Sequence, residues 1–293
     1  MRFDVYSPLV LSLLLAAGGP LTGRYVAPAA AARVLAAAAV VTAGATTWSL
    51  VLLGAALLGD VPPVVRDGGA AADPVPVVIG LAACLALVVV GVRLHRAVRA
   101  ERRTRRALRR LCAGQPADTE LIVAASAVPR ACAVPGRPGR ILVTSAMLGA
   151  LGPAERRALL AHERAHLAHR HDVLVTAATL AAAADPLLCP VRSAVVYLVE
   201  RWADERAAAA VGDRRTTAHA LARAALTAQR GGAVCALHFA DRAVTRRIAA
   251  LQAVPQPSLG SAALAVVALS TLPPLLAADA TRDLFRLLTG APL

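Results

Sequence analysis

Four long stretches of the chain contain no charged residue, and this feature restricts the possible folds more than any other. The stretches cover residues 5–23, 34–59, 74–92 and 248–278. Each is long enough for a helix that crosses a bilayer, which needs about 20 apolar residues. A buried helix of a soluble protein rarely stays uncharged for so long. We therefore predict four transmembrane helices, near residues 7–21, 34–58, 75–92 and 259–276.

The first stretch could also be a cleaved signal peptide, because Arg2 precedes its apolar run. However, Asp4 weakens the positive start, and no clear cleavage site with small residues follows. We therefore interpret this stretch as a retained membrane helix.

The positive charge of the chain predicts its orientation in the membrane. The formal net charge is +14. Loop 24–33 carries two arginines, loop 60–73 has a net charge of −2, and segment 93–111 has nine arginines against Glu101, a net charge of +8. Because basic loops stay on the cytoplasmic side, we place residues 24–33 and 93–250 in the cytoplasm. The chain is therefore expected to be a multi-pass protein of the inner or plasma membrane.

The Arg-rich segment 93–111 is predicted to be a helix that continues out of the third span. Its arginines recur at steps of three and four residues, so they would lie along the anionic inner leaflet, which attracts basic residues. The alternative is an Arg tract that binds nucleic acid. No aromatic residue stands between Arg93 and Tyr197, and a span directly precedes the tract, so we expect membrane lipid and no direct nucleic-acid partner.

Residues 112–250 have the pattern of a small α+β domain. Apolar residues cluster in Glu120–Ala125 and Arg140–Thr144, with prolines and glycines between them. This pattern predicts a two- or three-stranded antiparallel unit, and helices are expected after it.

The first of these helices carries the clearest chemical motif. Pro153 suits the first position of a helix, and His162 and His166 follow one turn apart on one face, with Glu163 between them. This is the HExxH pattern, in which both imidazoles bind one metal ion and the glutamate acts as the general base. The chain has only seven histidines, so an accidental match is not expected. We interpret His169 and His171 as structural.

A catalytic zinc ion needs a third protein ligand from another element. Pro190 is suited to open a second helix and Gly212 to close it. Within it, Glu200 can supply the carboxylate, and Asp204, one turn later, can hold a ligand histidine through its outer N–H. The alternative is a surface pair of carboxylates beside neighbouring arginines.

The strand Arg140–Thr144, the HExxH helix from Pro153 to Asp172 and the Glu-x3-Asp pair resemble the membrane gluzincins. The resemblance is greatest to the BlaR/MecR-type antirepressor metallopeptidases and more distant to the HtpX and CAAX-protease family. It implies an inserted zincin-like metallopeptidase domain with three membrane spans before it and one after it. The expected parts are 1–92 with three transmembrane helices, the juxtamembrane helix 93–111, the cytoplasmic peptidase domain 112–250, the fourth helix within 251–279, and a short external tail, 280–293.

The resemblance also implies an activity, namely zinc-dependent hydrolysis of peptide bonds in a cytoplasmic or membrane-associated protein. One Zn2+ per chain would be held by His162, His166 and Glu200, and Glu163 would be the base. An edge strand made by Ile141, Leu142 and Val143 would pair with the substrate. The substrate could be a BlaI/MecI-type repressor or the chain itself. Two alternatives stay open: an HtpX-type quality-control protease, and a non-catalytic receptor or scaffold.

Overall fold

The computed structural model describes residues 2–58, 76–116, 118–230 and 237–253, which form mainly helices and one small sheet. The helices are α1 (Arg2–Gly18), α2 (Pro28–Leu58), α3 (Val77–Leu111), α4 (Ser145–Ala150), α5 (Pro153–Ala168), α6 (His171–Ala184), α7 (Cys189–Val211), α8 (Arg214–Arg230) and α9 (Leu237–Gln252), with two short 3-10 helices, η1 (Gly19–Arg24) and η2 (Pro186–Leu188). The strands are β1 (Leu121–Ala124), β2 (Ala131–Val134) and β3 (Arg140–Thr144).

Two helices in the described part of the chain are long and apolar enough to cross a membrane. One covers Pro28–Ala55 within α2, and the other is α3. The first predicted span falls in α1, which belongs to a shorter apolar segment, Leu9–Arg24. The predicted fourth span, 259–276, lies outside the described residues. Of the three predicted spans that the described residues cover, the second and the third correspond to candidate membrane spans.

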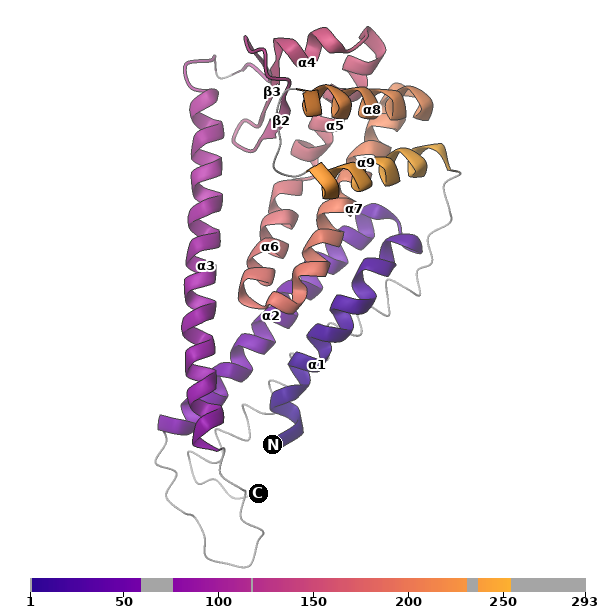
Figure 1. Cartoon of the computed structure of the whole chain (residues 1–293). Coiled ribbons are helices and arrows are strands. Elements are labelled where there is room, and N and C mark those ends of the chain that lie inside the picture. Colours follow the sequence, from indigo (N-terminus) through magenta and orange to yellow (C-terminus); the bar gives the residue numbers. More distant parts are fainter. Residues whose placement is uncertain (1, 59–75, 117, 231–236, 254–293) are drawn as a thin grey trace, which may run out of the picture.

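Helix α3 joins the predicted third span and the Arg-rich segment in one continuous helix of 35 residues. It stands at one side of the molecule (Figure 1). Its first half has a mean hydropathy of 2.6 over the most apolar window, of which only 11% is buried. Large apolar side chains such as Val78, Leu81, Leu85 and Val88 are exposed there. This helix thus turns an apolar surface outward before its arginines begin.

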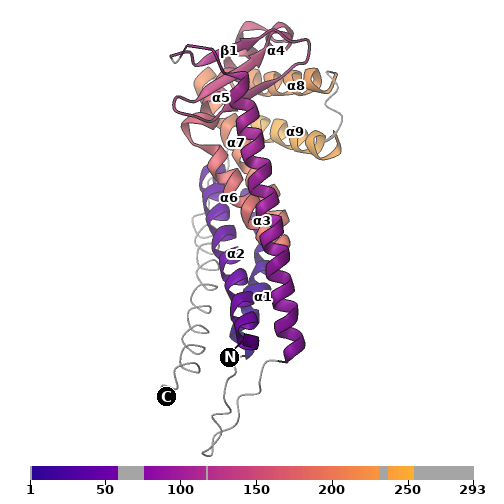
Figure 2. The same ribbon diagram turned by 90° about the vertical axis from the view of Figure 1, so that its left-hand side faces the viewer.

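Helices α6 and α7 share one hydrophobic core with α1 and α2. Leu35 and Ala39 of α2 pack in the same buried cluster as Leu188, Val191 and Val195, all of them almost without solvent exposure. Figure 2 shows α6 beside α2, below the end of the molecule that contains the sheet. The core is continuous because α6 has no charged residue after Asp172 and can therefore be packed on several sides.

A buried carboxylate fixes the end of this helical bundle. Asp185 lies at the turn after α6 and is 3% exposed. The hydroxyl of Ser12 donates a hydrogen bond to it at 2.6 Å, and the Thr46 hydroxyl lies 3.3 Å away. Since a buried polar group needs such hydrogen-bond partners, Asp185 ties the α6–α7 turn to α1 and α2.

The sheet has the strand order β1-β3-β2. Strands β2 and β3 are antiparallel, but β1 and β3 are parallel, so the predicted antiparallel unit is in fact a mixed sheet. The prediction that Ile141, Leu142 and Val143 form an edge strand is wrong. They lie in the central strand, where β1 and β2 occupy both sides of the backbone, and the edges of the sheet are β1 and β2.

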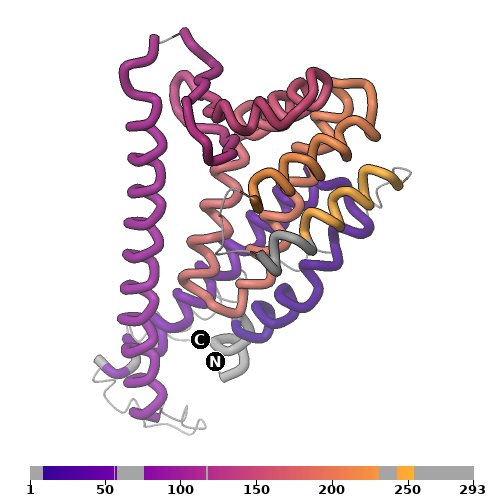
Figure 3. The backbone as a smooth tube through the Cα atoms, turned by 45° about the horizontal axis from the view of Figure 1, so that its top comes forward, coloured from indigo at the N-terminus to yellow at the C-terminus, as the bar shows by residue number. Residues whose placement is uncertain are grey.

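The sheet and helices α4, α5, α8 and α9 gather at one end of the long helices (Figure 3). Ile141 and Val143 are fully buried there in a core with Met147 and Leu151, against which Leu159 of α5 packs. This packing holds α5 beside the sheet, and α5 is the helix that carries the HExxH motif.

Candidate metal centre

Helix α5 owes its sharp boundaries to two local features. At its start, Pro153 occupies the first turn, and the Glu155 carboxylate accepts a hydrogen bond from the backbone N–H of Gly152 at 2.7 Å. This hydrogen bond lowers the pKa of Glu155. At its end, Arg170 adopts a left-handed conformation with φ 51°. Between these points the helix places His162 and His166 on one face, one turn apart.

Helix α7 supplies the carboxylates, and its boundaries match those predicted from Pro190 and Gly212. Pro190 lies in its first turn, and Gly212 closes it in a left-handed conformation with φ 77°. Ala203 is fully buried in this helix, which allows the α7 backbone to approach its neighbours closely. As a result, Glu200 and Asp204 come next to the histidines of α5.

The donor atoms of the three predicted ligands form a triangle. The Nε2 atoms of His162 and His166 are 3.1 Å apart, Glu200 Oε2 is 3.5 Å from His162 Nε2, and Glu200 Oε1 is 3.6 Å from His166 Nε2. A tetrahedral zinc ion with ligands at its usual bond lengths separates neighbouring donor atoms by about 3.3 Å. Two imidazoles and one carboxylate at these spacings therefore suit zinc with one position left open.

Asp204 orients His162 by contacting the ring nitrogen that does not face the other ligands. Its Oδ1 lies 3.0 Å from Nδ1 of His162, so that nitrogen donates its proton and Nε2 is left as the metal-binding atom. Burial opposes a charge on His162. The hydrogen bonds with Asp204 and Glu200 outweigh it and raise the pKa of His162 to about 10, so Nε2 must release a proton when it binds a metal ion. Glu200 stays ionised despite its burial, because His162 and Arg247 lower its pKa.

The second histidine is held by another histidine. Nδ1 of His166 lies 3.1 Å from Nδ1 of His171, which is 1% exposed. Burial lowers the pKa of His166 to about 4 and that of His171 to about 3, so both rings are neutral and one nitrogen of the pair can donate to the other. Trp202 packs on His171 and stacks on His169. These contacts fix the orientation of His166.

Arg247 of α9 completes the charge balance of the site. Its guanidinium donates two hydrogen bonds of 2.7 Å to the two oxygens of Asp204 and lies 2.9 Å from Glu200. The side chain of Arg247 is only 10% exposed. It therefore compensates two carboxylates that would otherwise repel each other, and it orients both of them.

Glu163 lies beside the sheet. It is 8% exposed, and burial raises the pKa of its carboxyl group. The backbone N–H of Ala133, in β2, forms a hydrogen bond with this carboxylate and opposes the shift. A carboxylate whose pKa is raised toward neutrality is suited to take up and release a proton.

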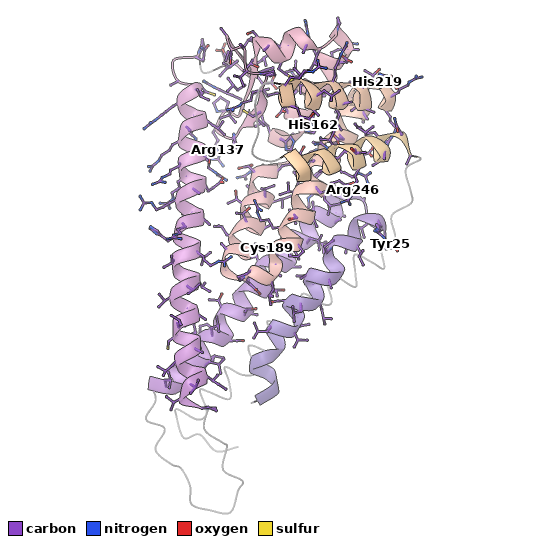
Figure 4. The ribbon with its side chains drawn as sticks, viewed as in Figure 1. Tyr25, Arg137, His162, Cys189, His219 and Arg246 are labelled. Carbon is purple, nitrogen blue, oxygen red and sulfur yellow. The ribbon has the colours of Figure 1, made fainter. Side chains whose placement is uncertain are left out.

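The structure thus brings His162, Glu163, His166, Glu200 and Asp204 together, and Figure 4 shows His162 inside the end of the molecule that contains the short helices. The predicted substrate residues 141–143 are not part of this group, because they lie in the central strand β3, and the strand that contacts Glu163 is β2. Sequence reasoning missed Arg247, since nothing in its local pattern distinguishes it from the other arginines of the chain. It also missed the contact of His171, although its spacing from His166 was visible.

Two histidines from one helix, a glutamate from a second helix and a buried glutamate base define a metallopeptidase of the HExxH class. The comparison with protein families agrees with this class. The model of peptidase family M48 matches residues 95–254, more than half of the chain, and the chain belongs to this family. No curated protein and no solved structure matches the chain. Its function is that of a metallopeptidase.

Proposed function

We propose that the chain is a membrane-embedded, zinc-dependent endopeptidase that acts on proteins at the cytoplasmic face of the membrane. The observation that carries this proposal is the triangle of His162, His166 and Glu200 donor atoms, with Asp204 behind it and the buried base Glu163 beside it. The candidate spans α2 and α3 support the membrane location.

The residues of the site divide the work of peptide hydrolysis. Zinc bound by His162, His166 and Glu200 would supply Lewis acidity, which polarises the scissile carbonyl and makes a water molecule more acidic. Glu163 takes the proton of the attacking water and transfers it to the leaving amine. Its raised pKa favours holding that proton between the two steps.

The open edge of β2 is the place where a substrate strand can pair. Arg130, directly before β2, pairs with Thr144 at the end of β3, and the N–H of Thr144 donates to the Arg130 carbonyl at 2.9 Å. In an antiparallel ladder, alternate residues turn to opposite sides, so the backbone groups of Ala131 and Ala133 point away from β3. Ala133 already reaches the base Glu163. A peptide that pairs with β2 would therefore lie beside the metal ligands.

The substrate we propose is a protein recruited to the membrane surface, with a BlaI/MecI-type repressor as the candidate for a signalling role. The helices that support the site share their core with the candidate membrane helices, which favours substrates held close to the bilayer. This role can be tested by measuring cleavage of the repressor in cells with and without this chain. Loss of unrelated membrane proteins instead would indicate an HtpX-type quality-control protease.

Metal analysis and a substitution of the base test the activity itself. The purified full chain should contain close to one zinc ion and cleave casein or itself. Glu163→Gln should keep the metal, because Glu163 is not a ligand, and should lower the cleavage rate by several orders of magnitude. Cleavage that continues unchanged in the variant, or a chain that binds zinc and shows no activity with any protein, would refute the enzymatic proposal.

A further inference from the structure

A large cavity lies away from the metal ligands, between the end of α3, the β2–β3 turn and the junction of α5 and α6. Its volume is about 1050 Å3, near the upper end of the range for small-molecule sites. Six arginines line it together with only two acids, Glu120 and Asp172, so its wall carries a net charge of +4. The arginines are Arg105, Arg109, Arg137, Arg140, Arg164 and Arg170.

Three of these arginines already have partners. Arg164 pairs with Glu120 at 2.8 Å, and Arg105 lies 3.4 Å from Asp172. The guanidinium of Arg140 donates to the backbone carbonyl of Cys112 at 2.8 Å. These contacts use the acidic groups of the cavity and hold its wall together.

The other three have no ion pair or side-chain hydrogen bond among the described residues. Arg109 comes from α3, Arg137 from the β2–β3 turn and Arg170 from the end of α5. Figure 4 shows Arg137 between α3 and the rest of the molecule. Three separate elements therefore bring exposed arginines without an ion pair to the lining of one cavity, and a ligand with several anionic oxygens can neutralise such a group.

The backbone of Arg170 gives a second, independent indication. It is the only non-glycine residue with positive φ in the described part of the chain. Glycine is the usual residue at such a position after a helix, and other side chains cost roughly 1 kcal/mol or more there. An arginine at this position places a charged side chain in the cavity wall at the expense of stability, and such local strain is typical of functional sites.

We propose that this cavity binds a multivalent phosphate group. Guanidinium groups match phosphate oxygens in geometry and charge, and the cavity has room for a molecule of nucleotide size. Arg105 lies twelve residues beyond Arg93, the first charged residue after the apolar part of α3, which is about 18 Å along a helix. This distance favours a soluble phosphate compound over a lipid headgroup. The proposal does not depend on the peptidase activity, because none of the metal ligands lines the cavity.

Binding of tripolyphosphate to the full chain in a neutral detergent tests the proposal. Calorimetry should give saturable binding, and the melting temperature should rise with ligand concentration, while sulfate at the same ionic strength has little effect. The double variant Arg109→Gln/Arg137→Gln should weaken binding by roughly tenfold or more for each lost guanidinium. The matched control is Arg103→Gln/Arg106→Gln, which removes the same charge from exposed positions of α3 that do not line the cavity.

Arg170→Gly keeps the test decisive if the double variant fails to fold. Glycine accepts the left-handed backbone without strain, so this variant should be at least as stable without ligand and yet bind tripolyphosphate at least tenfold more weakly. Equal loss in the control variant would overturn the proposal, because binding would then be a general surface effect. Equally tight binding of hexaglutamate would overturn it as well, in favour of an acidic peptide.

Nanodiscs distinguish the two sources of phosphate. In discs of neutral phosphatidylcholine, tripolyphosphate should bind as it does in detergent. If discs with phosphatidylglycerol leave this binding intact, the proposed ligand is a soluble phosphate compound. If they abolish it and Arg170→Gly removes the effect of the lipid, the phosphate group is that of a lipid headgroup. Absence of tripolyphosphate binding in both kinds of disc would contradict the proposal.

Discussion

At the scale of single residues, the metal centre depends on groups that hold its ligands as much as on the ligands themselves. Asp204 fixes His162, His171 fixes His166, and Arg247 neutralises the two carboxylates of α7. Such supporting groups normally change metal affinity by 10- to 100-fold when they are removed. The site therefore consists of the metal ligands and of a surrounding layer of side chains that hold them. The sequence motif shows mainly the ligands.

Arg247→Gln should damage both the fold and the metal site. The substitution leaves Asp204 buried with one partner fewer, and removing one member of a buried ion pair usually costs about 3–5 kcal/mol. We expect a clearly lower melting temperature and zinc affinity reduced by about tenfold or more, measured by thermal unfolding and chelator competition. Arg246→Gln, which removes an exposed arginine over the Tyr197 ring, should leave zinc affinity unchanged. Similar behaviour of the two variants would argue against this role of Arg247.

At the scale of elements, two short segments determine how the site works. Strand β2 is an edge of the sheet in the described part of the chain and lies beside the base, and helix α5 presents the HExxH motif from a capped first turn. Both depend on backbone hydrogen bonds, and both can be tested by substitutions that change one such bond.

Ala131→Pro should weaken substrate binding without loss of metal. The substitution removes an N–H that points away from β3, so the sheet should keep its own hydrogen bonds. If the substrate pairs with β2, kcat/KM should fall by about tenfold, mainly through KM, while the zinc content stays the same. Leu142→Val in the central strand β3 serves as the control, since it leaves the edge intact. An unchanged KM for Ala131→Pro would show that the substrate does not pair at this position.

Glu155 should make the stability of the fold sensitive to acid. The pKa of Glu155 in the folded state is lower than its ordinary value of 4.5. Its contribution to the folding stability is therefore fully present above the unfolded-state pKa and disappears as pH falls through the folded-state pKa. Glu155→Gln should therefore melt at a lower temperature than the native chain at pH 7, by an amount equivalent to about 0.5–1 kcal/mol. The difference should shrink below about pH 4. A difference that stays constant between pH 7 and pH 3 would contradict this explanation.

At the scale of the whole molecule, the peptidase part and the candidate membrane helices are packed as one body. Leu188, Val191, Val195 and Leu198 are nearly fully buried, and they lie in the core that also contains Leu35. The expected domain boundary near residue 112 is therefore a boundary in sequence, and the core crosses it.

A fragment that covers residues 93–253 should not fold as the complete chain does. Without α1 and α2, the apolar faces of α6 and α7 would be exposed to water. This exposure costs about 25 cal/mol of folding free energy for each Å2 of apolar surface. We expect aggregation, or a species without a cooperative melting transition, in size-exclusion chromatography and thermal unfolding. The full chain in the same detergent is the control. A soluble monomeric fragment with native-like melting and zinc binding would show that the peptidase part is independent.

The sequence alone was sufficient where a property depends on spacing within one element. His162, Glu163 and His166, and likewise Glu200 and Asp204, have their relative positions fixed by the helix itself. The start of α5 at Pro153 and the end of α7 at Gly212 follow equally from local backbone preferences, and the long apolar stretch in α3 is visible in its composition.

Only the tertiary structure decided which distant segments meet. Arg247 is 43 residues from Asp204, and β3 became the central strand because β1 and β2 both pair with it. The common core of α2 and α7, and the arginines that three elements direct to one cavity, likewise result from packing between segments far apart in the chain. Local sequence patterns restrict the periodicity and ends of an element, but they contain no information on which of several similar partners its faces will contact.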